Sequence, residues 1–398
     1  MKYLVIVGDG MADCPLEELQ GKTPLQVAHK PNMDEIAAKG RCGLLMTIPK
    51  GMEAGSDIAN LSILGYDPRK YYTGRGPLEA ASIGVELGKN DLAFRCNLIT
   101  DEGERIKDYC ADHITTEEAR KLIKEVGTAF AGVGEFYPGI SYRHLFVLRN
   151  STVELHCTPP HDALGRKIPR YLIKPKSDTT VKKLNQMILD SKKALAEHEV
   201  NLKRIEAGKN PANMIWLWGQ GKRPKMEPLK KKYGVSGAVI SAVDLLKGIG
   251  VYAGMEVINV PGATGYYDTN YEGKAKYALK ALEKKDYVYV HVESIDEASH
   301  AGDVEMKIKT IEDFDRRLVG KLLNGLEGEY KIAVLPDHFT PIKVMTHTKE
   351  PVPFAIYSPM GKSDDVKKFD EASAREGSLG LIEGEEFMKL LLQSNNRC

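Results

Sequence analysis

An apolar run in the C-terminal half of the chain ends in a segment that carries a carboxylate and an imidazole at helical spacing. The stretch YVYVHVESIDEASHAGD, residues 287–303, places Asp296 and His300 four residues apart. On one helical turn, residues i and i+4 project from the same face, so one oxygen and one nitrogen ligand could share a divalent cation. The spacing also occurs by chance in loops, so its meaning depends on whether other ligands gather in the same setting.

Further acids and histidines lie at the ends of other predicted strands. In a parallel α/β sheet, ligands bind beyond the carboxyl ends of the strands. Three Asp and three His are expected at that edge, too many for one tetrahedral zinc with an open position. They suit two divalent ions, Mn²⁺, Mg²⁺ or Zn²⁺ by ligand hardness. The six residues are Asp9, Asp296, His300, Asp337, His338 and His347.

A metal pair of this kind needs a nucleophile, and Ser56 is the candidate. It follows Gly55 in GMEAGSDIANLSILGYD, residues 51–67, and opens a predicted helical segment from Asp57 to Leu64. A helix N-terminus favours anions, phosphate in particular. The alternative is that Ser56 is a helix N-cap with no chemical role.

The elements that must position these side chains alternate along most of the chain. Helical spacing of apolar residues over 272–285 and 304–326 lies between apolar runs closed by turn residues. This alternation is typical of a doubly wound α/β domain with a mostly parallel sheet. The predicted strands are 3–8, 214–219, 237–241, 255–262, 286–292, 331–337 and 352–358.

The segment 88–175 has a different character, with shorter strands and richer loops. Thr115 and Glu118 form a capping box at the start of a predicted helix there. We interpret 88–175 as an inserted, smaller α+β cap domain. It divides a discontinuous main domain, residues 1–87 and 176–398, to which an amphipathic helix at about 178–199 returns the chain.

Composition excludes several classes of protein. The 398 residues are 42% hydrophobic and 28% charged with a net charge of +1, so no global field attracts nucleic acid or an anionic membrane. Six single cysteines (14, 42, 96, 110, 157 and 398) favour reduced thiols and a cytoplasmic protein. We find no signal peptide and no stretch of ~20 apolar residues that predicts a membrane span.

The ordered set of acids, histidines and serine resembles the alkaline phosphatase superfamily. Within it, GSDIANLSILGYDPRKYYTGRGPLEA (55–80) and PDHFTPIKVMTHTKEPVPF (336–354) are similar to the patterns of the cofactor-independent phosphoglycerate mutases of the archaeal type. The resemblance spans essentially the whole chain and implies an alkaline-phosphatase-like fold. A sister group proposed to be homoserine kinases shares these motifs.

The resemblance implies an isomerase of glycolysis that interconverts 3-phosphoglycerate and 2-phosphoglycerate without 2,3-bisphosphoglycerate. Ser56 would attack phosphorus and form a phosphoserine intermediate. Two divalent ions are implied, Mn²⁺ first, with Mg²⁺, Co²⁺ or Zn²⁺ as alternatives. One ion would be held by Asp296, His300 and His347, and the other by Asp9, Ser56, Asp337 and His338.

Charge arithmetic indicates that further cationic residues hold the small phosphorylated carboxylate substrate. Two dications carry about +4 formally, which three Asp and a serine alkoxide cancel. Arginine is the natural complement, because its fork binds phosphate and carboxylate bidentately. The candidates in the inserted segment are Arg95, Arg143 and Arg166.

Four other residues are further candidates. His113 resembles the phosphate-binding His of the family's cap, and His161 and Asp162 resemble the position of its acid/base group. Lys274 is a further substrate-binding candidate. Each of these, like the arginines, could equally be a solvated loop residue. We interpret His291 as a strand residue.

Three rival functions remain open at this point. The first is a homoserine kinase-like phosphotransferase, the second a metal-dependent phosphomonoesterase, and the third a catalytically silent metal-binding protein. A silent protein has no need of a nucleophile, so the third is disfavoured. The metal motif does not choose among the enzymes, because specificity resides in the cap. The sequence does not determine the oligomeric state.

Overall fold

In the computed structural model, which describes residues 1–393, the apolar runs near 3–8, 286–292 and 331–337 form three adjacent strands. They belong to an eight-stranded sheet in the order β13-β2-β12-β11-β1-β10-β8-β9. All described pairs are parallel except those that β12 makes with β11 and β2. The strands are β1 (Lys2–Gly8), β2 (Arg41–Met46), β8 (Gly237–Ile240), β9 (Glu256–Val257), β10 (Tyr287–Val292), β11 (Tyr330–Leu335), β12 (Val352–Tyr357) and β13 (Leu381–Glu383).

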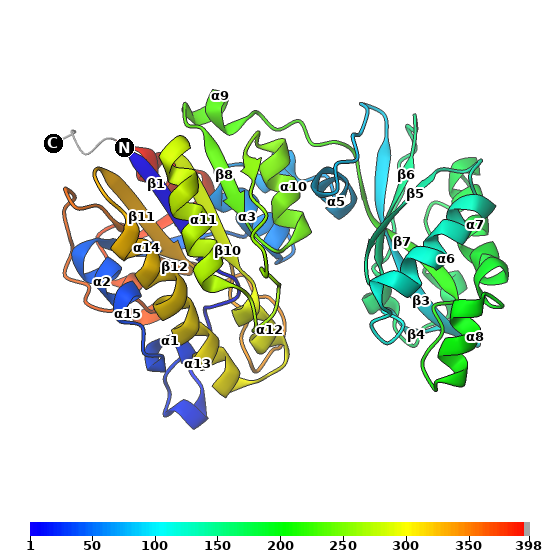
Figure 1. Cartoon of the computed structure of the whole chain (residues 1–398), viewed down its shortest axis with the longest axis horizontal. Coiled ribbons are helices and arrows are strands. Elements are labelled where there is room, and N and C mark those ends of the chain that lie inside the picture. The colour runs from blue at the N-terminus through cyan, green and yellow to red at the C-terminus, as the bar shows by residue number, and fades with distance from the viewer. Residues whose placement is uncertain (394–398) are drawn as a thin grey trace. The chain divides into compact units, whose positions relative to one another are not determined.

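Helices cover this sheet, as the alternating pattern predicts. Figure 1 shows α2 (Pro31–Lys39), α11 (Tyr271–Lys284), α13 (Val304–Asp313) and α14 (Gly320–Gly325) in front of it. The predicted helix 304–326 contains a π-helical segment, Phe314–Val319, between α13 and α14. The remaining helices are α1 (Pro24–Val27), α3 (Ser56–Ile63), α4 (Pro68–Tyr71), α9 (Leu229–Tyr233), α10 (Asp244–Tyr252), α12 (Ser294–His300), α15 (Glu371–Arg375) and α16 (Gly384–Leu392).

These elements make up the first of two units into which the contacts divide the chain. It comprises Met1–Tyr72 and the described residues from Lys225 onward, and the second unit is Thr73–Pro224. The α/β class with a mostly parallel sheet and a second, smaller unit inserted in it is therefore confirmed. The inserted unit begins earlier and ends later than the predicted 88–175, so the boundaries 1–87 and 176–398 differ from those observed.

The second unit is built on a five-stranded antiparallel sheet. Its path is β4-β3-β6-β5, and β7 also pairs with β3. Helix α6 begins with the predicted capping box, in which Glu118 N donates to Thr115 Oγ1 (3.3 Å) and Thr115 N donates to the Glu118 carboxylate (3.1 Å). The elements are β3 (Leu92–Glu102), β4 (Arg105–Asp108), β5 (Glu135–Ile140), β6 (Arg143–Leu148), β7 (Met214–Gly221), α5 (Arg75–Ser82), α6 (Thr116–Ala129), α7 (Thr179–Leu195) and α8 (Glu199–Glu206).

Two elements that we assigned to the main domain lie in the second unit. The strand predicted at 214–219 is β7, which pairs antiparallel with β3. The helix predicted at 178–199 is α7, which packs on β7 and α6. Its buried face, including Val181, Leu184 and Ile188, would suit either sheet. Local periodicity predicts that a helix has an apolar face but does not identify the sheet that covers it.

The described cysteines and helices agree with the composition. Cys14, Cys42, Cys96, Cys110 and Cys157 are free thiols. Cys398 lies outside the described residues. Within residues 1–393, every helix is too short or too polar to cross a membrane.

A buried ion pair ties α13 to two loops of the first unit. The Lys307 side chain is fully buried, and its Nζ donates to Asp13 Oδ2 (2.8 Å), to Thr340 O (3.0 Å) and more weakly to Ala12 O (3.4 Å). The ammonium therefore joins the loop after β1 to the loop after β11.

We expect Lys307→Met to lower the free energy of unfolding by about 3–5 kcal/mol, because the Asp13 carboxylate would remain buried without its partner. Urea denaturation at pH 7 measures this loss. Lys39→Met is the matched control, since Lys39 pairs with Glu35 at the surface and exposed pairs contribute little. A Lys307→Met midpoint equal to that of the control would contradict the expectation.

Candidate active site

The sheet brings three aspartates to one edge. Strand β1 lies between β10 and β11, with Gly8 opposite Val292 and Val7 opposite Leu335. Asp9 directly follows β1, Asp337 follows β11 after one proline, and Asp296 lies in α12, which follows β10. All three carboxylates are buried. The predicted gathering of acids at the carboxyl ends of the strands is thus present in the fold.

A first ligand group contains one carboxylate and two imidazoles. Helix α12 presents Asp296 and His300 on the same face, with Asp296 Oδ2 and His300 Nε2 3.1 Å apart. His347 Nε2 lies 3.0 Å from His300 Nε2 and 3.5 Å from Asp296 Oδ2. His300 Nδ1 is 2.9 Å from the carbonyl of Met345. That carbonyl fixes the ring so that its other nitrogen faces the group.

A second ligand group surrounds His338, which is fully buried. Its Nε2 lies 3.4 Å from Asp9 Oδ1, 3.5 Å from Asp337 Oδ2 and 3.2 Å from Ser56 Oγ. Asp9 follows β1, Asp337 and His338 follow β11, and Ser56 is the first residue of α3. The structure therefore assembles each of the two ligand sets that the family resemblance implies.

Ser56 opens α3 but does not cap it. Gly55 is the N-cap residue, and Ser56 is the first helical residue. The Ser56 hydroxyl contacts the His338 imidazole instead of the helix backbone. The alternative of a serine that only caps the helix therefore does not describe its position.

The close approach of acids and imidazoles shifts the pKa values of three of these side chains. Burial, and the neighbouring carboxylates of Asp337 and Asp296, raise the pKa of Asp9 well above its usual range. The hydrogen bond with Asp296 raises the pKa of His300 to about 9. Burial would raise the pKa of Asp296, but the hydrogen bonds with His300 and His347 hold it well below its usual range.

A buried carboxylate oxygen without a hydrogen-bond partner indicates that a cation could bind here. Asp9 Oδ1 is buried without a hydrogen-bond partner among the described residues. Buried carboxylates are costly unless they are paired or coordinate a metal. The grouped oxygens and imidazole nitrogens are ligand types of divalent first-row metals. The residues present therefore fit two divalent cations.

The sequence interpretation missed His291. This side chain is fully buried on β10, opposite Val7 of β1. Its Nε2 lies 3.2 Å from Asp9 Oδ2 and 3.9 Å from Asp337 Oδ2. A histidine one residue before the end of an otherwise apolar central strand is the signal that could have found it. From its place on β10, the His291 ring thus lies near the carboxylates of Asp9 and Asp337, which belong to the second ligand group.

Asn60 supports the second ligand group from within α3. Its Nδ2 donates to Asp337 Oδ2 (2.9 Å) and to Ser56 O (2.8 Å). Its Oδ1 accepts from the buried Tyr289 hydroxyl on β10. Gly10 N donates to the other oxygen of Asp337, at 3.1 Å. These bonds fix the orientation of the Asp337 carboxylate.

In the second unit, three cationic or ionisable side chains surround one indole. The guanidinium groups of Arg95 and Arg75 lie 4.9 Å and 5.6 Å from the centre of the Trp218 ring, and the His161 ring lies 5.5 Å from it. Burial lowers the pKa of Arg95, although Glu79, 3.3 Å away, opposes this. Arg95 and His161 were predicted site residues. Arg75 was not singled out, although it lies in the quoted motif TGRGPLEA.

Aromatic rings connect this cluster to two further candidates. Tyr109 lies 6.2 Å from both His161 and Tyr142, measured between ring centres. Tyr142 in turn contacts the Arg143 guanidinium (5.7 Å) and the His113 ring (5.9 Å). Four of the predicted cap residues, Arg95, Arg143, His113 and His161, therefore belong to one connected cluster with Arg75. We call these five residues the cationic cluster.

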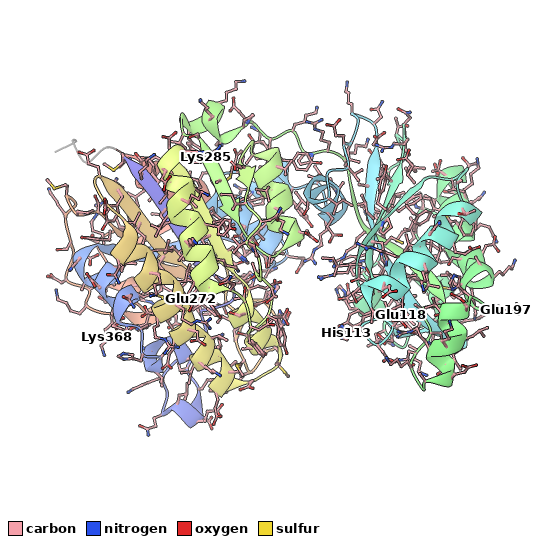
Figure 2. All side chains as sticks on the ribbon, viewed as in Figure 1. His113, Glu118, Glu197, Glu272, Lys285 and Lys368 are labelled. Atoms are coloured by element: carbon pink, nitrogen blue, oxygen red, sulfur yellow. The ribbon has the colours of Figure 1, made fainter. Side chains whose placement is uncertain are left out.

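The backbone that presents His113 is strained. Ala111, Asp112 and His113 all have positive φ angles, of 48°, 50° and 49°. Such conformations are costly for residues other than glycine and persist where the surroundings enforce them, often at functional sites. The His113 side chain is exposed, close to the start of α6 (Figure 2).

The remaining candidates have less distinctive settings. Asp162 is exposed beside His161, with 3.8 Å between Oδ1 and Nε2, and Arg166 is exposed. In the first unit, Lys274 is fully buried and donates to His291 O (3.0 Å). Burial lowers the pKa of Lys274 to about 8, against the opposing effect of Glu293. The roles predicted for Asp162, Arg166 and Lys274 stay predictions.

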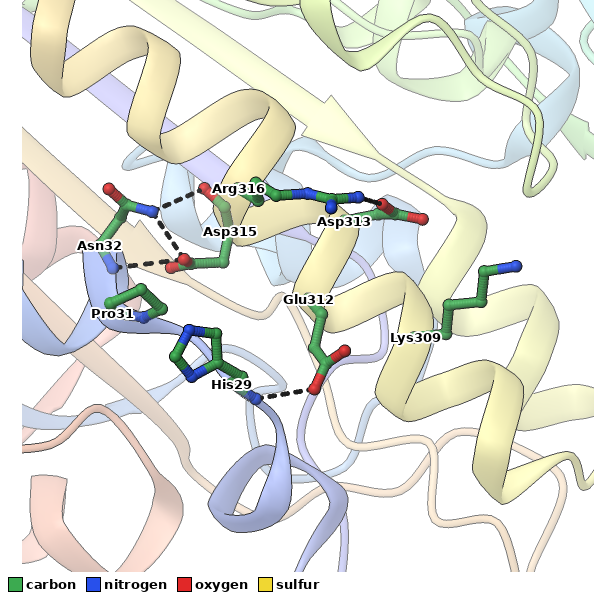
Figure 3. Close-up of a pocket in the computed structure, with 8 residues that line it drawn as sticks. All are labelled: His29, Pro31, Asn32, Lys309, Glu312, Asp313, Asp315 and Arg316. Carbon is green, nitrogen blue, oxygen red and sulfur yellow. Dashed lines mark hydrogen bonds and ion pairs between the residues drawn. The ribbon is translucent and has the colours of Figure 1, made fainter.

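A pocket of about 220 Å³ in the first unit does not involve the predicted site residues (Figure 3). It is lined by parts of α2, α13 and the π-helical segment. Asp315 accepts from the backbone N of Asn32 (3.2 Å) and of Met33 (2.7 Å) at the start of α2. Glu312 accepts from the backbone N of His29. These carboxylates stabilise the local backbone.

Comparisons with known proteins agree with the motifs. A family model for 2,3-bisphosphoglycerate-independent phosphoglycerate mutase matches residues 37–201. The 2,3-bisphosphoglycerate-independent phosphoglycerate mutase 2 of Methanothermobacter thermautotrophicus is 56% identical over 394 residues, which cover 98% of this chain and 97% of that protein.

Two solved structures are similar over nearly the whole chain. A protein from Pyrococcus horikoshii aligns with a TM-score of 0.86 at 32% identity, covering 100% of this chain and 99% of that one. The cofactor-independent phosphoglycerate mutase of Thermoplasma acidophilum aligns with a TM-score of 0.68 at 29% identity, covering 99% of each chain. The chain therefore belongs to the 2,3-bisphosphoglycerate-independent phosphoglycerate mutases, which are isomerases, as its sequence motifs predicted.

Proposed function

We propose that this chain interconverts 3-phosphoglycerate and 2-phosphoglycerate through a phosphoserine formed at Ser56. The observation that carries the proposal is the Ser56 hydroxyl at the start of α3, 3.2 Å from His338 Nε2. A nucleophile in this position faces a group of buried acids and imidazoles. The helix N-terminus favours the negative charge of a phosphoryl group.

Two divalent cations, Mn²⁺ by preference, would be held by the two ligand groups described above. When bound, they supply Lewis acidity that lowers the pKa of a hydroxyl and neutralises phosphoryl charge. Hydrogen bonds from Asn60 and Gly10 already orient the Asp337 carboxylate, and the bond that His300 Nδ1 donates to the Met345 carbonyl orients the His300 ring. Little rearrangement of these side chains is then needed on binding.

In the proposed reaction, Ser56 Oγ forms a bond to phosphorus as the bond between phosphorus and the glycerate oxygen breaks. The serine proton passes from Oγ to water, and the released glycerate oxygen gains a proton, for which His161 and Asp162 are the candidate donors. The second half is the reverse, with the other hydroxyl of glycerate attacking phosphorus and Ser56 regaining its proton. No external phosphoryl donor is required, so the reaction is a net isomerisation.

The cationic cluster supplies positive charge, which the two ligand groups with their cations would lack because they are near neutral overall. Three arginines and two histidines of the second unit offer charge for the substrate's carboxylate and phosphate. Retention of glycerate between the two half-reactions separates a mutase from a phosphatase. We propose that the cluster performs this retention, because groups that hold and orient the released glycerate favour transfer back to it over transfer to water.

Arg143→Ala should lower mutase turnover at least about tenfold and lower phosphate release from 3-phosphoglycerate much less. Arg143 is exposed next to Tyr142, so the substitution leaves the fold intact. Arg95→Ala should act in the same direction. Parallel assays of 2-phosphoglycerate and inorganic phosphate are made with 3-phosphoglycerate as substrate. The ratio of phosphate release to 2-phosphoglycerate formation should rise in both variants.

Arg120→Ala is the matched control, because Arg120 is an exposed arginine on α6 of the same unit and is not part of the cationic cluster. It should leave both rates unchanged. Equal losses of both activities in Arg143→Ala and Arg95→Ala would show that these arginines do not retain glycerate.

The proposed function itself is tested with purified protein and Mn²⁺, without 2,3-bisphosphoglycerate. Formation of 2-phosphoglycerate from 3-phosphoglycerate is the expected result. Inorganic phosphate alone would identify a phosphomonoesterase. Formation of ADP from ATP plus homoserine, with no mutase activity, would identify a homoserine kinase-like phosphotransferase.

A further inference from the structure

The Thr340 hydroxyl touches both ligand groups. Thr340 lies in the loop after β11 and is fully buried. Its Oγ1 is 2.6 Å from Asp296 Oδ1, which belongs to the first group. The same Oγ1 is 3.1 Å from His338 Nδ1, which belongs to the second group. One hydroxyl thus bridges Asp296 of the first ligand group and His338 of the second.

The chemistry of the three atoms determines the direction of both hydrogen bonds. A carboxylate only accepts, and a hydroxyl has a single proton. Thr340 Oγ1 therefore donates to Asp296, and His338 Nδ1 must donate to Thr340. A neutral imidazole with its proton on Nδ1 has its lone pair on Nε2. That nitrogen faces Ser56 Oγ and Asp9 Oδ1, which is the arrangement a metal ligand requires.

The backbone of Thr340 is anchored on both sides. Its N donates to Ala12 O (3.2 Å), and its carbonyl accepts from the buried Lys307 ammonium (3.0 Å). Close approach of the loops leaves room only for glycine at position 10, where a Cβ would lie 2.3 Å from Asp296 Oδ1 and 2.6 Å from Thr340 Oγ1. The hydroxyl is therefore held in place independently of any bound cation.

We propose that Thr340 is a positioning residue that couples the two cation sites. Its hydroxyl orients Asp296 for one site and sets the ligating tautomer of His338 for the other. Loss of this single hydroxyl then weakens both sites together. The inference rests on the metal centre of the proposed function, and it adds a residue that acts through the side chains of Asp296 and His338.

The test is Mn²⁺ binding to Thr340→Val and Thr340→Ser, measured by isothermal titration of metal-free protein. Valine keeps the branched shape and lacks the hydroxyl, whereas serine keeps the hydroxyl. We expect valine to weaken both Mn²⁺ sites by about 10–100-fold, the usual effect of losing a partner that orients a ligand. Serine should stay within about threefold of the wild type, since its hydroxyl restores both hydrogen bonds.

Thr310→Val is the matched control. Thr310 is a buried threonine on α13 whose hydroxyl, among residues 1–393, bonds only to the helix carbonyls of Met306 (2.9 Å) and Lys307 (3.0 Å). It should bind Mn²⁺ like the wild type. Thermal melts of the metal-free variants show whether Thr340→Val and Thr310→Val are equally folded.

Several outcomes would overturn the proposal. Unchanged Mn²⁺ affinity in Thr340→Val, weakening of one site alone, or equal losses in the valine and serine variants would each contradict coupling through the hydroxyl. Absence of Mn²⁺ binding to the wild type would instead refute the metal centre itself. If Thr340→Val does not fold, nitrogen chemical shifts of His338 in the metal-free wild type decide, because a proton on Nε2 would also overturn the proposal.

Discussion

Ser56→Ala should lower mutase turnover by more than about a thousandfold, as expected when the nucleophile of a covalent mechanism is removed. The fold should be preserved, because Gly55 and not Ser56 is the N-cap of α3. The change in the free energy of unfolding is expected to stay below about 1 kcal/mol. A coupled assay that consumes 2-phosphoglycerate measures turnover, and urea denaturation measures stability.

Ser62→Ala is the control for this substitution, since Ser62 is a buried serine on the same helix and outside both ligand groups. It should remain fully active. Acid quenching of the wild type during turnover, followed by mass spectrometry, should find phosphate on the peptide that contains Ser56. Turnover of Ser56→Ala within tenfold of the wild type would refute the phosphoserine mechanism.

Removal of divalent metal should abolish turnover, and Mn²⁺ should restore it. The physical reason is the set of buried carboxylates of Asp9, Asp296 and Asp337, whose mutual repulsion needs nearby positive charge. After exhaustive dialysis against EDTA, activity should fall below about 1% of the starting value. Elemental analysis of the reconstituted protein should find about two Mn²⁺ per chain, one for each ligand group.

Asp296→Asn is the matching substitution, and Glu305→Gln is its control. Asp296 takes part in the first ligand group, whereas Glu305 is exposed on the neighbouring helix α13. Only Asp296→Asn should lose bound metal and activity. Full activity of dialysed protein with no detectable metal would exclude a two-metal enzyme.

Local sequence patterns were sufficient to predict that the acids of the two ligand groups lie at one edge of the sheet. Apolar runs followed by turn residues predicted the strands β1, β10 and β11, and carboxyl ends of parallel strands meet at one edge of a sheet. Asp9, Asp296 and Asp337 could therefore be grouped without knowing the strand order. The spacing of Asp296 and His300 predicted their common face because helix geometry is local.

Residues whose partners lie on other elements were not identified in this way. Thr340 is meaningful only because its hydroxyl lies between Asp296 and His338, and Arg75 only because it shares the Trp218 ring with Arg95. His291 carries a local signal, as one polar residue near the end of an apolar strand, but its neighbour Asp9 is identified only when β10 is placed beside β1. Such contacts depend on the packing of segments far apart in the chain.

Two elements were assigned to the wrong unit from the sequence, also because their contacts depend on segments far apart in the chain. Strand β7 and helix α7 have the apolar patterns of a strand and an amphipathic helix, and both patterns were predicted. Their partners, β3 for the strand and β7 with α6 for the helix, are set by long-range pairing and side-chain packing. An apolar face specifies that it must be buried, and the three-dimensional fold specifies what buries it.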